Sequence, residues 1–244
     1  MHPSLSIVVP TFLEAESLAR LVPALFEELE PRGYQPEVIV VDDGSTDGTP
    51  DVARDLAQSY AVRLIERQDR RGLATAVIEG FDASRADVLV VLDADGSHPV
   101  SAIPKLVDAV GSGEFAIAVG SRHAEGGGFR EWPLFSRLKS RFAAFFARGL
   151  TDLRDPTSGF MAVRRDLYET LELDPIGWKI VLEVVVRAAP APWVEIPIIF
   201  EKRTHGVSKQ TPWILLQYWR HCIRLYRHRK RVARLHGEEP SCAS

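Results

Sequence analysis

Two aspartates one residue apart, Asp93 and Asp95, directly follow the apolar run at 88–92. If that run is a buried strand, two carboxylates of like charge lie at its end and repel each other unless a positive partner is present. The hard cations Mg²⁺ and Mn²⁺ bind carboxylate oxygens together with the phosphate oxygens of a substrate. The pair therefore indicates a divalent-cation site for a phosphorylated ligand.

A second acidic pair, Asp42 and Asp43, ends another apolar run, at 38–41. Gly44 permits a tight turn after it, and the residues at 45–47 are of types that cap helices. Taken alone, a capped turn explains this cluster as well as a ligand site does. Two acidic strand ends in one sheet favour a shared ligand site over chance.

The first half of the chain alternates between short β-branched runs and amphipathic stretches of helical length. The runs lie at 5–10, 37–43, 62–66 and 87–93. This alternation is typical of βαβ units around a mostly parallel sheet. The runs at 38–41 and 88–92 contain only Val, Ile and Leu, so we expect central strands covered on both faces. Ligands of such sheets bind at the carboxyl ends of strands, where both aspartate pairs fall.

The second half of the chain is less regular. The predicted elements are a strand at 115–122, a loop at 124–129, a helix at 133–150, a strand entering a helix at 157–171, a helix at 176–189, a strand at 194–203 and a helix from residue 212. We expect an α/β domain over 1–210, a basic amphipathic helix over 211–235 and a disordered tail over 236–244.

Composition excludes several classes of protein. The 244 residues carry a formal net charge of −3, which gives no reason to expect nucleic-acid binding. Cys222 and Cys242 lack metal-ligand spacing, so we expect no zinc site and a reducing cytoplasm. The sequence shows no signal peptide and no apolar run of membrane-spanning length. PTFLEAE stands where a dinucleotide-dependent dehydrogenase needs GxGxxG.

An ordered set of motifs resembles the family 2 inverting glycosyltransferases and, within them, the dolichyl- or polyprenyl-phosphate mannose synthases. The motifs are SIVVPTFLEAESL, EVIVVDDGSTDGT, RGLATAVIEGF, VLVVLDADGSHP, VGSR, DPTSGFMAVRR and IGWKIVLEVVVRA, and the resemblance covers residues 4 to 210. It implies a Rossmann-like α/β domain of the GT-A fold, which is the catalytic domain. It further implies GDP-mannose as donor, Mg²⁺ or Mn²⁺ as cofactor and a polyprenyl or dolichyl monophosphate as acceptor.

The resemblance also implies roles for the acidic loops. The metal site would consist of Asp93 and Asp95, with Ser97 where the family often has Gln. Asp93 would also belong to the nucleotide-sugar site. The other residues implied to bind the nucleotide sugar near the first two strands are Pro10, Thr11, Glu14, Asp42 and Asp43. The family's PTYNE motif reads PTFLE here, with Leu13 in place of Asn.

Basic residues would hold the phosphates. The resemblance assigns Arg122, Lys179 and Arg203 to catalysis, together with the two metal-site aspartates. Arg203 and Lys209 would close over the nucleotide sugar. The acceptor phosphate would contact Arg122, Arg137, Arg141 and Ser158.

Simpler interpretations of some of these residues remain open. Arg122 could form a surface ion pair, and Lys179 could form a solvated pair with Glu183, four residues on. Residues 157–159 could form an ordinary turn. We interpret His98 and His205 as incidental, because neither has a partner at ligand spacing.

The predicted carboxyl-terminal helix has apolar residues at intervals of three and four, with arginines between them. Such a helix is typical of a segment that lies on anionic lipid, although packing against the domain explains the pattern equally well. The first interpretation places the protein peripherally on the cytoplasmic membrane face. It allows for a small membrane-protein partner.

A phosphate acceptor is anionic near neutral pH, with a second pKa of about 6, so it can attack the sugar without a general base. We therefore expect metal-dependent inverting transfer of mannose from GDP-mannose, giving a polyprenyl-phosphate β-mannose. One alternative is transfer of another hexose, for example from UDP-glucose. A second is a noncatalytic nucleotide-sugar-binding relative.

Overall fold

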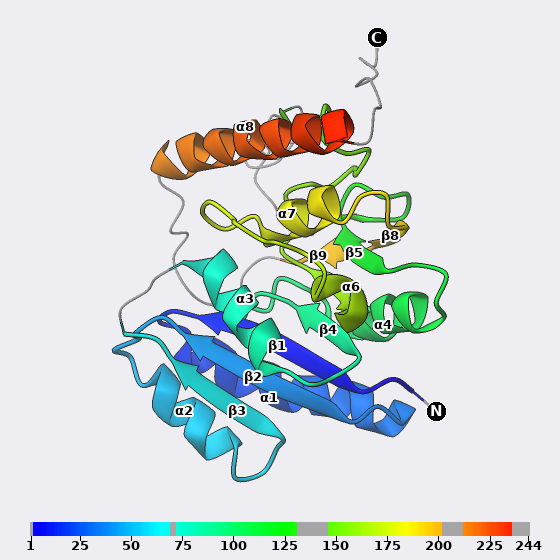
Figure 1. Cartoon of the computed structure of the whole chain (residues 1–244). Helices are drawn as coiled ribbons and strands as arrows, with labels where there is room; N and C mark the ends of the chain where they lie inside the picture. Colours follow the sequence, from blue (N-terminus) through cyan, green and yellow to red (C-terminus); the bar gives the residue numbers. More distant parts are fainter. Residues whose placement is uncertain (1, 69–71, 131–145, 202–211, 236–244) are drawn as a thin grey trace.

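The computed structural model describes residues 2–68, 72–130, 146–201 and 212–235 (Figure 1). Most of the helix predicted at 133–150 and all of the tail at 236–244 lie outside these residues. No helix in the described ranges is both long and apolar enough to cross a bilayer. The predicted α/β organisation is confirmed, with helices on both sides of a central sheet.

The central sheet has seven strands in the order β3-β2-β1-β4-β7-β5-β8. Their bounds are β1 Leu5–Thr11, β2 Pro36–Asp42, β3 Val62–Glu66, β4 Val88–Val91, β5 Ile117–Ser121, β7 Met161–Arg164 and β8 Trp193–Pro197. Strand β7 is antiparallel to β4 and β5, and the other pairs are parallel, as expected of a mostly parallel sheet. Of the two strands expected at the centre, β4 is the middle strand and β2 is an interior one.

The helices fill the connections between strands. They are α1 Ala15–Leu29, α2 Thr49–Leu56, α3 Leu73–Ala83, α4 Ile103–Gly111, α6 Arg165–Tyr168, α7 Ile180–Arg187 and α8 Pro212–Leu235, with 3₁₀ turns at Glu30–Arg32 and Val100–Ala102. A second, two-stranded sheet pairs β6 Gly128–Phe129 with β9 Ile199–Phe200. The strand predicted at 194–203 is therefore confirmed only in part. It is two strands, because the chain leaves the central sheet after Pro197 and Ile199–Phe200 pairs with β6, and residues 202–203 lie outside the described residues.

The core lies on both faces of the sheet. Alternate residues of β1 face opposite ways, so that Ile7 belongs to the apolar cluster that includes α1 and α4, whereas Val8 belongs to the cluster that includes α3 and α7. Helix α3 approaches β1 so closely that a Cβ on Gly80 would lie 2.5 Å from a methyl group of Val8. Burial on both faces explains the continuous apolar runs of the inner strands.

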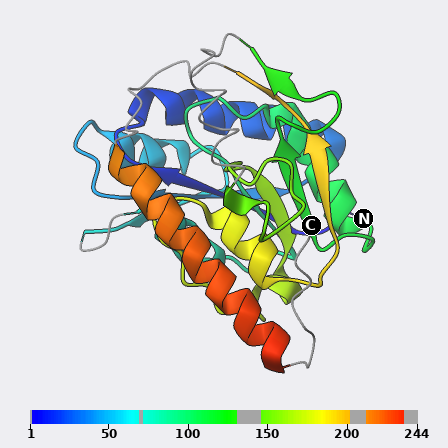
Figure 2. The same cartoon turned by 90° about the horizontal axis from the view of Figure 1, so that it is seen from above.

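Helix α8 lies across α7 on the outside of the domain (Figures 1 and 2). A third apolar cluster joins the two helices with the segment before β7; it consists of Ala147, Leu150, Leu182, Val186, Tyr218, Cys222 and Leu225. The packed-helix interpretation of the carboxyl-terminal segment is therefore correct for this face of α8.

Candidate active site

The first acidic loop follows β2 and lies beside the end of β1, where Thr11 pairs with Asp42. The buried Asp42 carboxylate accepts hydrogen bonds from the main-chain N–H groups of Gly44 and Ser45, at 3.1 and 2.8 Å. It also accepts hydroxyl bonds from Ser45 and Thr11, at 2.6 and 2.9 Å. Asp42 and Thr11 therefore shape the turn that carries Asp43.

Asp43 forms a buried ion pair with Arg67, which directly follows β3. The Arg67 Nη1 atom lies 2.7 Å from Asp43 Oδ1, and the main-chain N–H of Gly72 donates to Asp43 Oδ2 at 2.7 Å. Arg67 also donates to the hydroxyl of Thr75. Arg67 is not among the site residues predicted from the sequence, although its position directly after a parallel strand is a signal for the same edge of the sheet.

The segment after β1 is fastened to the loop after β2. The main-chain N–H of Leu13 donates to Ser45 Oγ at 2.8 Å, and that of Glu14 donates to Thr49 Oγ1 at 3.0 Å. Leu13 has a φ of 57°, in the left-handed region that leucine rarely adopts. These hydrogen bonds hold Pro10, Thr11 and Glu14 at the same edge of the sheet as Asp43.

The second acidic loop follows β4, the neighbour of β1. Asp95 is buried, and its Oδ1 atom accepts bonds from the main-chain N–H and the hydroxyl of Ser97, at 3.0 and 2.5 Å. The Asp93 side chain is 29% exposed. The structure thus brings the three predicted metal-site residues together, with Ser97 orienting Asp95 and Asp93 the more open carboxylate.

His98 supports this loop, so its interpretation as incidental is wrong. The main-chain N–H of Asp93 donates to its Nδ1 atom at 3.2 Å, and its ring lies 5.1 and 5.3 Å from those of Phe160 and Phe200. Burial lowers the pKa of His98 although Asp93 and Asp95 oppose the shift. A neutral ring is also what an acceptor at Nδ1 requires.

The loop before β7 packs directly on Asp93. A Cβ on Gly159 would lie 3.3 Å from the nearer Asp93 carboxylate oxygen, so glycine leaves room beside this group. Ser158 donates its hydroxyl to the carbonyl of Gly120 at 2.7 Å and accepts the N–H of Phe160 at 3.1 Å. Ser158 thus fixes the loop against β5, and its predicted phosphate contact would require the hydroxyl to turn away from Gly120.

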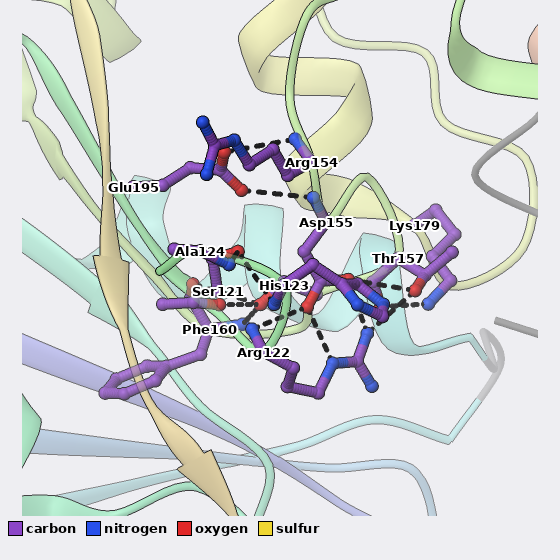
Figure 3. Close-up of polar contacts among 12 residues, drawn as sticks. Ser121, Arg122, His123, Ala124, Arg154, Asp155, Thr157, Phe160, Lys179 and Glu195 are labelled. Atoms are coloured by element: carbon purple, nitrogen blue, oxygen red, sulfur yellow. Dashed lines mark hydrogen bonds and ion pairs between the residues drawn. The ribbon is translucent and has the colours of Figure 1, made fainter. Parts of the chain in front are cut away.

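Arg122 follows β5 and contacts the loop before β7 (Figure 3). Its Nε and Nη2 atoms each lie 2.6 Å from an oxygen of Asp155, and Nη2 donates to Thr157 Oγ1 at 2.7 Å. Burial alone would raise the pKa of Asp155, but the hydrogen bonds and charge of Arg122 outweigh it and hold that pKa at about 2. The ion pair considered for Arg122 exists, but it is buried rather than on the surface.

Lys179 precedes α7 and is buried, with its Nζ atom donating to the carbonyl of Thr157 (Figure 3). The Nζ atom also lies 3.2 Å from the ring centroid of Trp178. Burial lowers the pKa of Lys179 well below its ordinary value, and the charge of Arg122 lowers it further, against Asp155 and Asp93. The solvated pair of Lys179 with Glu183 is wrong, because Glu183 is buried and pairs with Arg187 and His221.

Asp93 and Asp95 fit a divalent cation whose remaining ligands come from a substrate and from water. The described ranges contain no group of three or more His, Cys, Asp or Glu side chains placed to hold a metal. Asp93 and Asp95 supply carboxylate oxygens, and Mg²⁺ or Mn²⁺ usually completes such a shell with phosphate oxygens and water. Four further predicted phosphate contacts lie outside the described residues: Arg137, Arg141, Arg203 and Lys209.

Comparison with known proteins agrees with this site. Residues 6–172 match the model of glycosyl transferase family 2. The chain is 38% identical over 234 residues to a dolichol-phosphate mannosyltransferase of Pyrococcus furiosus, an alignment that covers 94% of this chain and 66% of that protein. It is 35% identical to the dolichol-phosphate mannosyltransferase of Saccharomyces cerevisiae, with 91% and 86% of the two chains covered.

Solved structures show the same fold. A mannosyltransferase from Pyrobaculum calidifontis in complex with GDP-Man and Mn²⁺ has a TM-score of 0.65 at 21% identity, covering 92% of this chain and 65% of that one. A glucosyl-3-phosphoglycerate synthase from Mycobacterium tuberculosis, with UDP and Mn²⁺, has a TM-score of 0.64 at 19% identity and covers 98% and 82%.

The architecture is that of the GT-A fold, as the sequence motifs predicted. The family match and the relatives at 38% and 35% identity define the protein as a glycosyltransferase. The chain belongs to glycosyl transferase family 2.

Proposed function

We propose that this protein transfers mannose from GDP-mannose to a polyprenyl or dolichyl monophosphate, with inversion at the anomeric carbon. The observation that carries the proposal is the loop at 155–160, which joins the acidic and the basic parts of the site. Gly159 lies against Asp93, while Thr157 accepts a bond from Arg122 and another from Lys179. A metal-bound diphosphate and a second phosphate would thus lie on either side of one rigid loop.

Donor binding falls to the acidic strand ends. Asp93 and Asp95 would hold Mg²⁺ or Mn²⁺, which when bound neutralises the charge of the departing diphosphate. The turn shaped by Asp42, together with the Asp43–Arg67 pair, would line the nucleoside pocket. The names of the relatives support a mannosyl donor and a dolichol or polyprenol phosphate acceptor.

Acceptor binding falls to Arg122 and Lys179. A phosphate oxygen of the acceptor forms a bond to the anomeric carbon as the bond to the GDP oxygen breaks, and GDP leaves with the electron pair. The acceptor is already anionic, so no side chain needs to remove a proton. Orientation and charge account for the rate, and the phosphate charge favours the ammonium form of Lys179 in its buried position.

The outer face of α8 suits a membrane surface. Leu216, Trp219 and Tyr226 are 42%, 48% and 45% exposed and share one side of the helix, since they are three and seven residues apart. Arg227 and Lys230 are exposed beside them. Exposed apolar and aromatic groups flanked by basic ones favour binding to anionic lipid, where the acceptor is found. A small membrane-protein partner stays a prediction.

A donor panel tests the proposal. The protein is given a short-chain polyprenyl phosphate, Mn²⁺ and either GDP-mannose or UDP-glucose, and the lipid product is measured by mass spectrometry. We expect a hexosyl-phosphate lipid with GDP-mannose. Product from UDP-glucose alone would support the other-hexose alternative. Nucleotide binding without transfer from either donor would support a noncatalytic role.

A further inference from the structure

The loop segment at 174–178, which leads into Lys179, contacts helix α8. Arg224 pairs with the Asp174 carboxylate at 2.5 Å and donates to the Asp174 carbonyl at 3.1 Å. One turn earlier on α8, the Nδ1 atom of His221 lies 2.9 Å from the carbonyl oxygen of Ile176. Three residues of the helix thus line the loop, because Gln217 lies against Gly177.

Glu183 joins this loop to both helices. Its carboxylate is buried and accepts the main-chain N–H of Asp174 at 2.9 Å. It also pairs with Arg187 on its own helix and with His221 Nε2 on α8, the latter at 2.8 Å. Burial acts to raise the pKa of Glu183, but its hydrogen bonds and the charges of its partners hold it below the ordinary value. A buried carboxylate with these partners fixes the position of all three segments.

The fixed loop ends at the active site. Gly177 has a φ of 80° and turns the chain toward Trp178 and Lys179. Lys179 then donates to the carbonyl of Thr157, whose hydroxyl accepts from Arg122. Contacts therefore run without a break from α8 to the phosphate-binding side of the site.

We infer that His221 and Glu183 are positioning residues for Lys179, with α8 serving as the support that holds this lysine against the loop at 155–160. The inference rests on the proposed function in so far as Lys179 binds the acceptor phosphate. Lys179 lies three residues after Ile176, which contacts His221, so movement of this segment on loss of its supports would displace the Lys179 ammonium group. A displacement of about 1 Å at such a group can cost up to about a hundredfold in rate.

A double-mutant cycle tests the inference in the full-length protein with a detergent-solubilised short-chain acceptor. His221→Leu is expected to lower kcat/KM for the acceptor by about tenfold while GDP binding stays within about twofold. In a Lys179→Met background, His221→Leu should cause no further loss of kcat/KM for the acceptor. His221→Gln, which keeps a polar amide at the position that lies 2.8 Å from Glu183, should recover most of the activity. Losses that multiply in the double variant would overturn the inference.

Arg224→Gln provides a second route, since this exposed side chain can be changed without disturbing the core. It should weaken acceptor turnover in the same direction as His221→Leu, whereas Arg220→Gln, on an exposed turn of the same helix, should leave turnover unchanged. Equal effects of the two arginine substitutions would also overturn the inference.

Hydrogen exchange separates this inference from the proposed function. Main-chain amides at 174–179 should exchange faster in His221→Leu and Arg224→Gln than in the wild type and in Arg220→Gln. Unchanged exchange in both variants would refute the support by α8 whatever the substrate. If the wild-type protein transfers no mannose to polyprenyl phosphate, the proposed function fails, and the exchange comparison alone decides whether α8 holds the loop.

Discussion

The guanidinium of Arg122 and the carboxylate of Asp155 form a two-pronged ion pair in which both shortest distances are 2.6 Å. Asp155 is fully buried and Arg122 nearly so, with the Arg122 guanidinium 5.5 and 5.1 Å from the ring centroids of Phe129 and Phe200. Because bidentate pairs fix the plane of a guanidinium, Asp155 determines how Arg122 faces the site.

Substitution of Asp155 should therefore impair both stability and activity. Asp155→Asn leaves the Arg122 charge buried without its partner and should lower the free energy of unfolding by about 3 kcal/mol at pH 7. Urea unfolding measures this, with Asp152→Asn as a control on the same segment. A difference below about 0.5 kcal/mol would show that the pair contributes little.

The same pair predicts an acid-dependent loss of stability. The pKa of Asp155 is about 2 in the folded protein against an ordinary value of 3.8. Because the pKa of Asp155 is lower in the folded than in the unfolded protein, its ionised carboxylate stabilises the folded state at pH values above the unfolded pKa. This contribution to the free energy of unfolding, about 2 kcal/mol, is present above pH 4 and is lost as the pH falls toward 2. The stability gap between the wild type and Asp155→Asn should narrow across that window. A gap that stays constant from pH 6 to pH 3 would contradict the assignment.

The metal assignment predicts separate effects on turnover and folding. Asp95→Asn retains an acceptor oxygen for Ser97 but removes the negative charge, so metal-dependent transfer should fall by at least about a hundredfold. The thermal midpoint should change little. Calorimetry with Mn²⁺ and GDP would show the lost affinity, and undiminished transfer would exclude Asp95 from the metal site.

Gly159→Ala tests the contact between the loop at 155–160 and Asp93. The new Cβ would lie 3.3 Å from a carboxylate oxygen, so Asp93 must shift by a few tenths of an ångström. We expect weaker Mn²⁺-dependent nucleotide binding. Gly149→Ala is the matched control, because a Cβ at that position meets no atom within 4 Å. Identical metal affinity in both variants would argue against a ligand role for Asp93.

Leu13 offers a prediction for stability alone. The left-handed conformation, with a φ of 57°, costs a leucine about 1 kcal/mol. Asparagine adopts this conformation more readily because of its short polar side chain. Leu13→Asn should raise the free energy of unfolding by roughly that amount, and Leu13→Val should lower it. The opposite order in urea unfolding would show that the left-handed conformation is not maintained in solution.

The strand ends of the site could be predicted from the sequence because apolar runs mark buried strands and the aspartates follow them directly. Asp93, Asp95 and Asp43 were predicted as candidate site residues in this way. Local patterns could not reveal contacts between distant segments. Arg122 and Asp155 are 33 residues apart, and the His98 ring, which supports Asp93, packs on the ring of Phe200 from a distant segment.

The carboxyl-terminal helix shows the same limit. Its spacing allowed either packing on the domain or contact with lipid, and the structure shows why both interpretations were open: Tyr218 and Leu225 pack on α7, while Trp219 and Tyr226 remain exposed on another side. Periodicity indicates that a helix has apolar sides. Only tertiary structure shows which of them is covered.

Formation of the lipid product with metal and without it tests the central claim most directly. Labelled GDP-mannose and a short-chain polyprenyl phosphate are incubated with the protein in Mn²⁺ or in excess EDTA, and the anomeric configuration of the lipid product is determined by NMR. We expect a β-mannosyl phosphate in Mn²⁺ and no product in EDTA. An α-linked product, or equal transfer in EDTA, would contradict metal-dependent inverting transfer at Asp93 and Asp95.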